Sequence, residues 1–377
     1  METKNTLLDN AEYFLEDHNV TTEDGYILTL QRFLKRDAPE KGTDRQDLIL
    51  PKKKPAVLLV PGLFCIGKNW IIAEINLPKL LIEQGFDCWL PSPRGTLPSR
   101  KHTSLASSSK KYWDFSFHEV AIYDLSAIIN YIIDTTGNIT LSYIGHSMGC
   151  TIFLTLLSCR PEYCSKISVC IFLAPACYGR HVRSIVTKAS IPILNCLASS
   201  KFLRKRPILN WTASNYVRYT VPMSKRDIVA GWLLRISARV ASVTSSKGID
   251  KEIYRRMAYE IPNTTSLKLV CHGFQCIVAD KFQNYDYGRS QNQKIYGQLN
   301  PPLYELGNIS TPIAIFSSKG DHLCSTQDIA RLSEELPNLI SHNCIEDKKF
   351  SHGDFIFGKN AQASVFENII QILTEYI

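Results

Sequence analysis

The chain has 377 residues, of which 45% are hydrophobic and 21% charged, and this composition excludes a disordered chain. A chain of this length holds one large domain with an insertion, or two or three smaller units. The net charge is +8, but the basic residues are scattered rather than gathered in a stripe with aromatic residues. We therefore expect no nucleic-acid partner and at most weak peripheral contact with lipid surfaces.

The first predicted elements form a hairpin. Val20 to Phe33 carries two apolar-rich runs joined by Asp24-Gly25, a dipeptide suited to a turn with positive φ. The polar stretch before these runs has a helix-like pattern. Residues 36–54 are polar and without periodicity, so we expect a loop there.

From residue 55 onward, apolar runs of strand length alternate with helical patterns. The predicted strands are residues 55–60, 86–90, 139–144, 167–173, 313–316 and 340–345, and the predicted helices are residues 70–84, 118–135, 148–159, 327–335 and a last helix from 361. Strands that are apolar on both faces and alternate with amphipathic helices predict an α/β fold, with a mostly parallel central sheet and helices on both faces.

The alternation breaks over residues 178–305, which have helical patterning and no strand of core character. After this stretch the order of strand and helix resumes. One sheet interrupted by a helical cap explains the pattern better than two separate domains. We therefore expect a core formed by residues 1–177 and 306–377, with the cap at 178–305.

A Gly-His-Ser-Met-Gly pentapeptide spans residues 145–149, directly between a predicted strand and a predicted helix. In this context the serine occupies a sharp strand-to-helix turn, which is typical of a nucleophile exposed at the edge of a sheet. The helix dipole and the free N–H groups beside it favour a developing oxyanion. Ser147 is the predicted nucleophile.

A serine nucleophile needs a histidine base, and that base needs a carboxylate partner. In sheets that carry this turn, the acid and then the histidine follow the serine along the chain. Asp321 is the preferred acid because it follows the predicted strand 313–316. Asp354 and Glu346 are rivals in less suitable positions, the first too near the histidine candidate and the second within a strand region.

Three histidines follow Asp321, namely His322, His342 and His352. His322 adjoins the acid and could not easily turn back to it, and His342 lies near the start of a predicted strand. His352 falls in the loop between the last strand and the last helix, where a base is expected. The predicted triad is therefore Ser147, Asp321 and His352.

An oxyanion hole requires two backbone N–H donors. One comes from the residue after the nucleophile, and the second comes from the loop that follows the strand at 55–60. Met148 and Leu63 are the predicted pair.

The segment Cys271-His272-x3-Cys276 resembles half of a metal site, but no second pair of ligands stands out. Packing or a local disulfide is the preferred interpretation. No glycine-rich phosphate loop follows a strand. We expect neither a metal nor a cofactor.

The sequence gives conflicting indications of the cellular compartment. Most of the 12 cysteines lie in apolar segments, which favours reduced thiols. Five Asn-x-Ser/Thr sequons instead favour export, at Asn19, Asn138, Asn210, Asn263 and Asn308. No signal peptide is visible after Met1 and no apolar run reaches the roughly 18 residues needed to span a bilayer.

Taken together, the motifs resemble those of the acid lipases, the family that includes gastric and lysosomal acid lipases. The shared motifs run from about Val20 to the C-terminus and are Thr22-Glu23-Asp24-Gly25-Tyr26, Gly62-Leu63 with Asn69-Trp70, Ser92-Pro93-Arg94-Gly95, Tyr112-Trp113-x-Phe115-Ser116-Phe117, Tyr123-Asp124-Leu125, the pentapeptide at 145–149, Phe282-Gln283-x-Tyr285-Asp286-Tyr287-Gly288, Pro301-Pro302-x-Tyr304, Gly320-Asp321 and His352-x-Asp354-Phe355. Two positions depart from the family pattern: Pro61 replaces a histidine and Met148 replaces a glutamine.

The resemblance implies an α/β-hydrolase core, a helical cap over the active site, and hydrolysis of triacylglycerols or sterol esters at a lipid interface by Ser147, Asp321 and His352. It also implies a secreted or lysosomal protein, whereas a chain that truly starts at Met1 would be intracellular. Two alternative functions remain open, a soluble esterase for short-chain esters and a catalytically dead lipid-binding protein.

Overall fold

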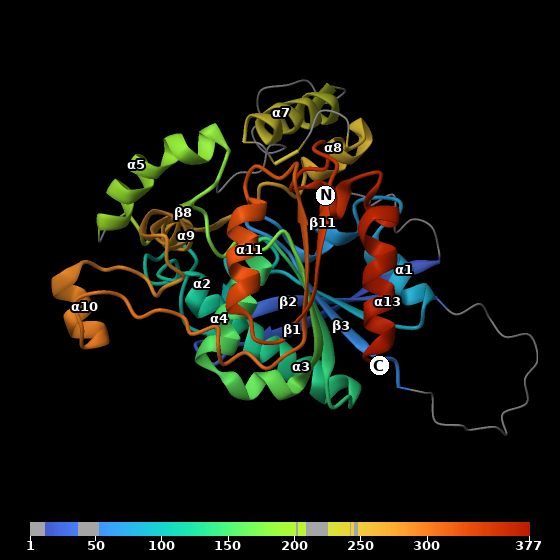
Figure 1. The fold of residues 1–377 in the computed structure, drawn as a ribbon, viewed down its shortest axis with the longest axis horizontal. Coiled ribbons are helices and arrows are strands. Elements are labelled where there is room, and N and C mark those ends of the chain that lie inside the picture. Colours follow the sequence, from blue (N-terminus) through green and yellow to red (C-terminus); the bar gives the residue numbers. More distant parts are fainter. Residues whose placement is uncertain (1–11, 37–52, 201–202, 209–224, 242, 245–247) are drawn as a thin grey trace, which may run out of the picture.

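A nine-stranded sheet runs through the centre of the protein in the computed structural model, which describes residues 12–36, 53–200, 203–208, 225–241, 243–244 and 248–377 (Figure 1). The strand order is β1-β2-β4-β3-β6-β7-β10-β11, and β5 pairs with β2. The bounds are β1 Tyr13–Thr21, β2 Tyr26–Lys35, β3 Ala56–Val60, β4 Asp87–Pro91, β5 Lys101–His102, β6 Leu141–His146, β7 Ile167–Leu173, β10 Ile313–Ser318 and β11 Leu339–Ile345.

The pairing from β4 to β11 is parallel throughout, and β1, β2 and β5 are antiparallel additions. Every residue of β3, β4, β6 and β10 is buried. These strands are apolar on both sides because helices cover both faces of the sheet. The α/β prediction, with its mostly parallel sheet, is confirmed.

Two layers of helices cover the sheet. Helices α1 and α13 lie on one face, and α2, α3, α4 and α11 lie on the other (Figure 1). The bounds are α1 Leu77–Glu83, α2 Phe117–Glu119, α3 Ser126–Thr136, α4 Met148–Cys159, α11 Thr326–Glu335, α12 Asp354–Phe357 and α13 Glu367–Glu375. The bounds of α4 and β7 agree with the predicted helix and strand at 148–159 and 167–173.

Two predicted elements need correction. The hairpin is present, and Gly25 in its turn has a φ of 94°, but the described part of the stretch before Val20 is not helical, because residues from Tyr13 onward pair with β2. Backbone pairing with a neighbouring strand overrides the local pattern here. The helix predicted at 70–84 is split into a 3-10 turn at Gly67–Ile71 and α1, since the Asn76 side chain accepts a hydrogen bond from Lys79 N and caps a new helix.

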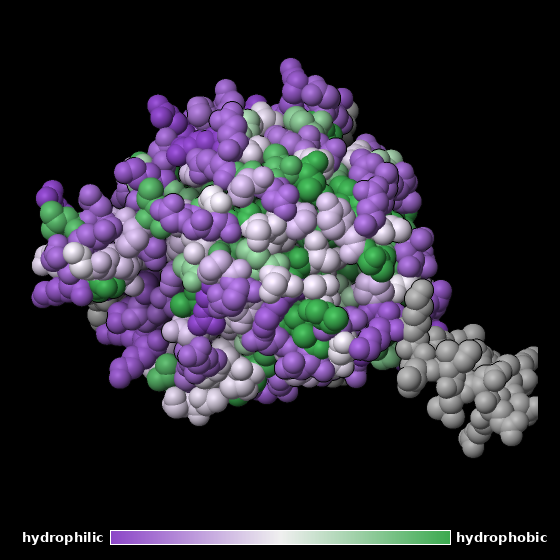
Figure 2. Space-filling model, turned by 60° about the horizontal axis from the view of Figure 1, so that its bottom comes forward, coloured by the Kyte–Doolittle hydropathy of each residue, from purple (hydrophilic) through white to green (hydrophobic). Residues whose placement is uncertain are grey.

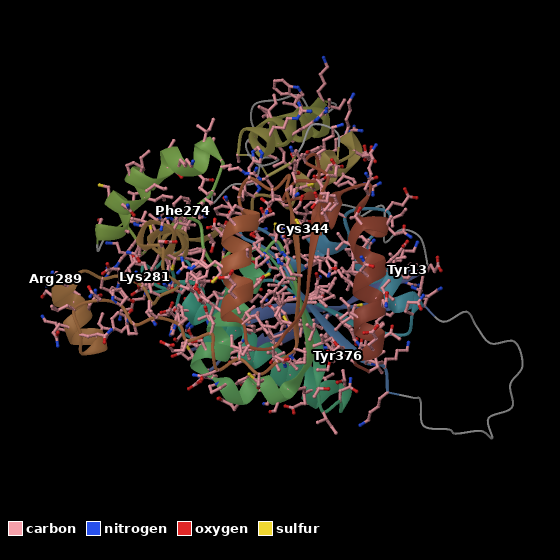
Figure 3. The ribbon with its side chains drawn as sticks, viewed as in Figure 1. Tyr13, Phe274, Lys281, Arg289, Cys344 and Tyr376 are labelled. Carbon is pink, nitrogen blue, oxygen red and sulfur yellow. The ribbon has the colours of Figure 1, made fainter. Side chains whose placement is uncertain are left out.

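Residues between β7 and β10 form five described helices and a short strand pair, above and to the left of the sheet in Figure 1. The bounds are α5 Ile185–Ser199, β8 Pro207–Ile208, α7 Arg226–Val240, α8 Lys251–Met257, β9 Thr265–Ser266, α9 Leu267–Ala279 and α10 Arg289–Tyr296. Helices α5 and α9 pack together around a second apolar cluster, separate from the main core, and Phe274 lies at their junction (Figure 3).

The buried Arg94 connects the N-terminal hairpin to the helical layer through two ion pairs. Arg94 is 1% exposed and its guanidinium lies 2.6 Å from Asp24 in the hairpin turn and 2.6 Å from Asp124, which precedes α3. The ring of Tyr26 lies 3.9 Å from the guanidinium carbon. Removing one carboxylate from such a buried guanidinium leaves an uncompensated charge. Arg94, Asp24 and Asp124 therefore stabilise the structure as one unit.

All 12 cysteines are unpaired, which agrees with the prediction of reduced thiols. No helix in the described ranges combines the length and the apolar character needed to cross a bilayer. The face shown in Figure 2 is largely hydrophilic, with apolar side chains in small patches. Most of the predicted loop at 36–54, and the sequon at Asn210, lie outside the described residues.

Candidate active site

Ser147 lies on a strained turn between β6 and α4. Its φ of 54° and ψ of −115° lie in a region that non-glycine residues rarely occupy. The turn is held by the Ser147 N–H, which donates to Leu173 O at the end of β7 at 2.9 Å. The backbone thus presents the serine at the carboxyl edge of the sheet, and the side chain is only partly buried.

The two glycines of the pentapeptide permit this turn. A Cβ atom on Gly149 would lie 2.6 Å from the carbonyl oxygen of Val60 in β3, and one on Gly145 would lie 3.0 Å from the backbone nitrogen of Cys150. Both contacts involve backbone atoms that cannot move aside easily. Any larger residue would push α4 away from the sheet and displace Ser147.

Asp321 and His352 are in direct contact. His352 Nδ1 lies 2.7 Å from Asp321 Oδ2, and the two residues are 5% and 0% exposed. The carboxylate can only accept, so Nδ1 carries the proton and Nε2 is left for another partner. Among the described residues no hydrogen bond joins Ser147 Oγ to His352, and such contacts are often looser without substrate.

The environment keeps Asp321 ionised. Burial alone would raise the pKa of this carboxyl, but the neighbouring His352 imidazole and two backbone N–H groups outweigh burial, so the pKa lies below its usual value. The N–H groups belong to Leu323 and Cys324, at 2.8 and 3.0 Å from Asp321 Oδ1. A carboxylate fixed in this way can orient an imidazole and stabilise its positive form.

His146 supports the loop that carries His352. Its Nε2 donates to the carbonyl oxygen of His352 at 3.0 Å, and the two ring centroids are 4.7 Å apart. Burial, with a smaller effect of His352, lowers the pKa of His146 to about 3, so this ring is neutral near pH 7. The sequence analysis missed this contact, although the histidine stands within the pentapeptide.

The rival acids and bases lie in other surroundings. Asp354 caps its own loop by accepting from Ser351 N at 2.7 Å. Glu346 is an exposed partner of Lys319 at 2.6 Å. His322 is exposed, and His342 is bound through Nε2 to Ser317 Oγ at 2.8 Å. Within the described residues, none of these side chains forms a hydrogen bond or an ion pair with the side chain of His352 or Asp321.

The loop after β3 lies against the nucleophile. A Cβ atom on Gly62 would lie 3.2 Å from Ser147 Cβ, which places the adjacent Leu63 beside the serine. Phe64 has a φ of 64°, an unfavourable value for a bulky residue. Its carbonyl oxygen accepts a hydrogen bond from Asn263 N at 2.8 Å, and this contact stabilises the strained loop.

Asn263 was interpreted from the sequence as one of five glycosylation sequons, and the structure gives it another role. It is 1% exposed, and its side-chain oxygen accepts from Leu97 N at 2.8 Å while its nitrogen donates to Glu260 O at 3.3 Å. A buried side chain with these partners has no room for a glycan. Asn263 instead joins the loop at Leu97 to the segment before β9.

The half metal site suggested by the sequence is a packed cluster. His272 stacks on Phe117 with ring centroids 3.8 Å apart and donates from Nε2 to Gln283 O at 2.9 Å. Cys271 and Cys276 are both free thiols, facing the carbonyl oxygens of Leu194 and Gln283. The prediction that this segment is a packed cluster is therefore confirmed, and the alternative prediction of a local disulfide is wrong.

Asp321, Cys324 and His352 have ligand atoms within 4.8 Å of one another, and among the described residues they are the group that could hold a metal. Burial, with a smaller effect of Asp321, raises the pKa of the Cys324 thiol well above its usual value. A thiol binds metals as the thiolate. The protonated Cys324 and the direct bond between the other two side chains suit proton transfer better than metal binding.

Comparisons with known proteins agree with the α/β fold. Residues 55–195 match a model of the alpha/beta hydrolase fold, and residues 5–74 match a model of a partial alpha/beta-hydrolase lipase region. The structure is similar to that of a monoglyceride lipase from Saccharomyces cerevisiae, with a TM-score of 0.58, 16% identity and coverage of 97% of this chain and 96% of that one. This likeness shows the fold.

Curated relatives extend over nearly the whole chain. Human lipase member K is 32% identical over 97% of this chain and 89% of its own length. Human lysosomal acid lipase/cholesteryl ester hydrolase is 30% identical over 96% and 88%, and rat gastric triacylglycerol lipase is 31% identical over 96% and 89%. The chain therefore belongs to the acid lipase family of α/β-hydrolases, and with it to the carboxylic ester hydrolases.

Proposed function

We propose that Ser147, His352 and Asp321 form the catalytic triad of this hydrolase. The buried contact of 2.7 Å between His352 and Asp321, at the same sheet edge as the strained Ser147, carries the proposal. His352 Nε2 takes the Ser147 hydroxyl proton while Oγ bonds to the ester carbonyl carbon. The histidine then gives this proton to the leaving alkoxide, which departs as the alcohol and leaves an acyl-enzyme.

Water then releases the acyl group by the same route. His352 takes a proton from water, the hydroxide oxygen bonds to the acyl carbon, and the proton returns to Ser147 Oγ as the carboxylic acid leaves. Asp321 holds the Nδ1 proton throughout and stabilises the positive ring. His146, beside the His352 ring, is neutral and therefore adds no positive charge that would oppose the protonation of that ring.

The backbone N–H groups of Leu63 and Met148 form the oxyanion hole in this proposal. Neither donates a hydrogen bond within the described part of the chain, so both are available. Met148 opens α4, whose dipole favours negative charge at this end. The side chains that depart from the family pattern, at Pro61 and Met148, leave both donors in place because the donors belong to the backbone.

The substrates are water-insoluble lipid esters, of the triacylglycerol or sterol ester type named in the relatives. Leu63 and Phe64 pack against the second apolar cluster, which α5 and α9 supply. An acyl chain attached to a carbonyl in the oxyanion hole would meet this apolar surface first. Residues 178–305 then act as a cap, and residues 1–177 and 306–377 form the core.

Contact with the lipid interface is assigned to α7 in the cap. Its outer face exposes four large apolar side chains, at Ile228, Trp232, Leu233 and Ile236. Trp232 is 58% exposed, which is unusual for a residue of its size. An apolar stripe of this kind on one helix suits partial insertion into a lipid surface.

Covalent labelling tests the triad. We expect a fluorophosphonate probe to label the native protein and to leave Ser147→Ala unlabelled and inactive. Full activity of Ser147→Ala would overturn the proposal. Binding of lipid by the native protein without labelling or turnover would favour the catalytically dead lipid-binding alternative.

Chain length tests the substrate class. Rates on tributyrin, triolein and cholesteryl oleate emulsions should favour the long-chain esters and rise once an interface forms. Trp232→Gln should lower the rate on emulsions about tenfold and leave hydrolysis of a dissolved short ester unchanged. A preference for short dissolved esters, with no rise at the interface, would favour the soluble esterase.

A further inference from the structure

The segment that leads from β7 into α5 lies across the loop that carries the proposed acid. The backbone N–H groups of Arg183 and Ser184 both donate to the carbonyl oxygen of His322, at 2.9 and 3.0 Å. The Arg183 side chain adds two hydrogen bonds, from Nη2 to the carbonyl oxygens of Lys319 and Asp321, at 2.8 and 2.7 Å. Two adjacent residues at the start of the cap therefore bind three carbonyl groups of the acid loop.

We propose, on the basis of the triad proposed for this hydrolase, that Arg183 is a positioning residue for Asp321. Its guanidinium binds the backbone oxygen of Asp321, while the carboxylate of the same residue binds His352. Arg183 therefore acts on where the carboxylate lies. Hydrogen bonds from a charged donor are stronger than neutral ones, and a planar guanidinium is already oriented for such contacts.

The loop that carries the base contacts the acid loop as well. Ser318 Oγ donates to the carbonyl oxygen of Phe350 at 2.6 Å, two positions before His352. A Cβ atom on Gly320 would collide with the same carbonyl oxygen, so the two loops lie in close contact there. The acid loop is bound by the base loop through Phe350 and by the cap through Arg183, and both contacts determine where its carboxylate lies.

The backbone around Arg183 is fixed by its two neighbours. Val182 and Ser184 are 4% and 0% exposed. Ser184 Oγ donates to the carbonyl oxygen of Ala241 at 3.1 Å and accepts from Thr187 N at 3.3 Å, which caps α5. Because the backbone is already ordered, Arg183 loses less conformational freedom when it binds the acid loop. The Arg183 residue itself is exposed, so replacing it leaves no cavity in the core.

The position of Arg183 connects the acid to the part of the cap that supplies the apolar surface. Helix α5 begins at Ile185, directly after the two residues that bind the acid loop. The same helix contributes to the second apolar cluster, against which Leu63 and Phe64 pack. A shift of the start of α5 would therefore displace the guanidinium and, through its two hydrogen bonds, the backbone of Asp321.

A second arginine in the same segment offers a matched control. Arg180 lies three positions before Arg183, and its side chain is 69% exposed. Its Nη1 lies 3.2 Å from Asp280 Oδ2 at the end of α9. Arg180 therefore binds another part of the cap, whereas Arg183 binds the acid loop. Replacing either arginine removes one positive charge from the same stretch of surface, so a difference between the two variants reports the contact with the acid loop.

Steady-state kinetics of the full chain on a dissolved ester test the positioning role. Arg183→Met keeps a long side chain without donors and should lower kcat about tenfold, with little change in KM, because a displaced acid orients His352 less well. Arg183→Lys keeps a charged donor and should recover part of the rate. Arg180→Met should behave as the native protein does. Because both arginines are exposed, all three variants should melt well above the assay temperature.

A double-mutant cycle separates positioning of the acid from a general structural effect. In an Asp321→Asn background, Arg183→Met should lower the single-turnover acylation rate by less than about twofold, because the acid that it positions is already lost. A tenfold loss in both backgrounds, an equal loss in Arg180→Met, or full activity of Arg183→Met beside an impaired Asp321→Asn would overturn the role of Arg183 alone. Full activity of Asp321→Asn would instead overturn the triad, and the role of Arg183 with it.

Discussion

His146 Nε2 donates a hydrogen bond of 3.0 Å to the carbonyl oxygen of His352, the residue whose own Nδ1 is bound to Asp321. The residue before the nucleophile thus positions the backbone of the base. Its Nδ1 has no hydrogen-bond partner in the described part of the chain. A buried polar atom left without a partner is costly, so the bond from Nε2 to His352 O is the favourable polar contact of this buried ring.

Replacing this ring should affect catalysis more than binding. We expect His146→Leu to lower kcat about tenfold, which corresponds to roughly 1.4 kcal/mol, because the His352 loop loses its anchor, and to change KM little. His146→Gln can donate to the same carbonyl and should recover part of the rate. Steady-state kinetics on a dissolved ester would measure both, and equal losses in kcat for the two variants would contradict a positioning role.

Asp321→Asn should lower kcat about 10⁴-fold. The amide removes the negative charge and offers a donor where His352 Nδ1–H needs an acceptor, so the imidazole is held in the wrong tautomer. Asp354→Asn, a change of the same kind at a buried neighbour, should keep most of its activity. Single-turnover acylation by a chromogenic ester would measure both variants, and comparable losses would mean that the acid is wrongly assigned.

Stability at acid pH should also depend on Asp321. Its folded-state pKa lies below the usual value, while the unfolded value is about 3.9. The carboxylate therefore contributes stability that is fully present above about pH 4 and is lost as the pH falls through the folded-state pKa. Urea unfolding between pH 6 and pH 2 should show a smaller acid loss in Asp321→Asn than in the native protein. A parallel decline in both would argue against this linkage.

Gly149→Ala should destabilise the protein by about 1–3 kcal/mol and abolish most activity, since its Cβ would lie 2.6 Å from Val60 O. The control is Gly273→Ala in α9, where a Cβ meets nothing within 4 Å. There a gain of about 0.5–1 kcal/mol is expected, because alanine favours the helix. Thermal melts and ester hydrolysis of both variants separate crowding at the turn from a general effect of the added methyl group.

Local patterns along the chain predicted most of the core. Helix α4 and strand β7 could be placed because uninterrupted apolar runs and a sharp turn at Ser147 leave few alternatives. The start of β1 was missed because its polar residues become a strand only through pairing with β2. Propensity alone cannot report such a distant partner.

The same limit applies to the candidate site. Asp321 and His352 were chosen from chain order, and the structure brings them into contact. The left-handed Phe64 and its hydrogen bond to Asn263, 199 positions along the chain, have no local signal. The Asn-x-Thr sequon at Asn263 even predicts an exposed side chain, whereas the structure buries it.

The unit formed by Arg94, Asp24 and Asp124 bears on how the molecule opens. Strand β1 is at the edge of the sheet, and an edge hairpin would ordinarily fray first. If this hairpin separated from the helical layer, the buried Arg94 guanidinium would lose the Asp24 carboxylate before water could take its place. Amide protons of Gly25 and Tyr26, which bond to Thr22, should consequently exchange with deuterium as slowly as those of the central strands, and Asp24→Asn should speed their exchange without affecting β7.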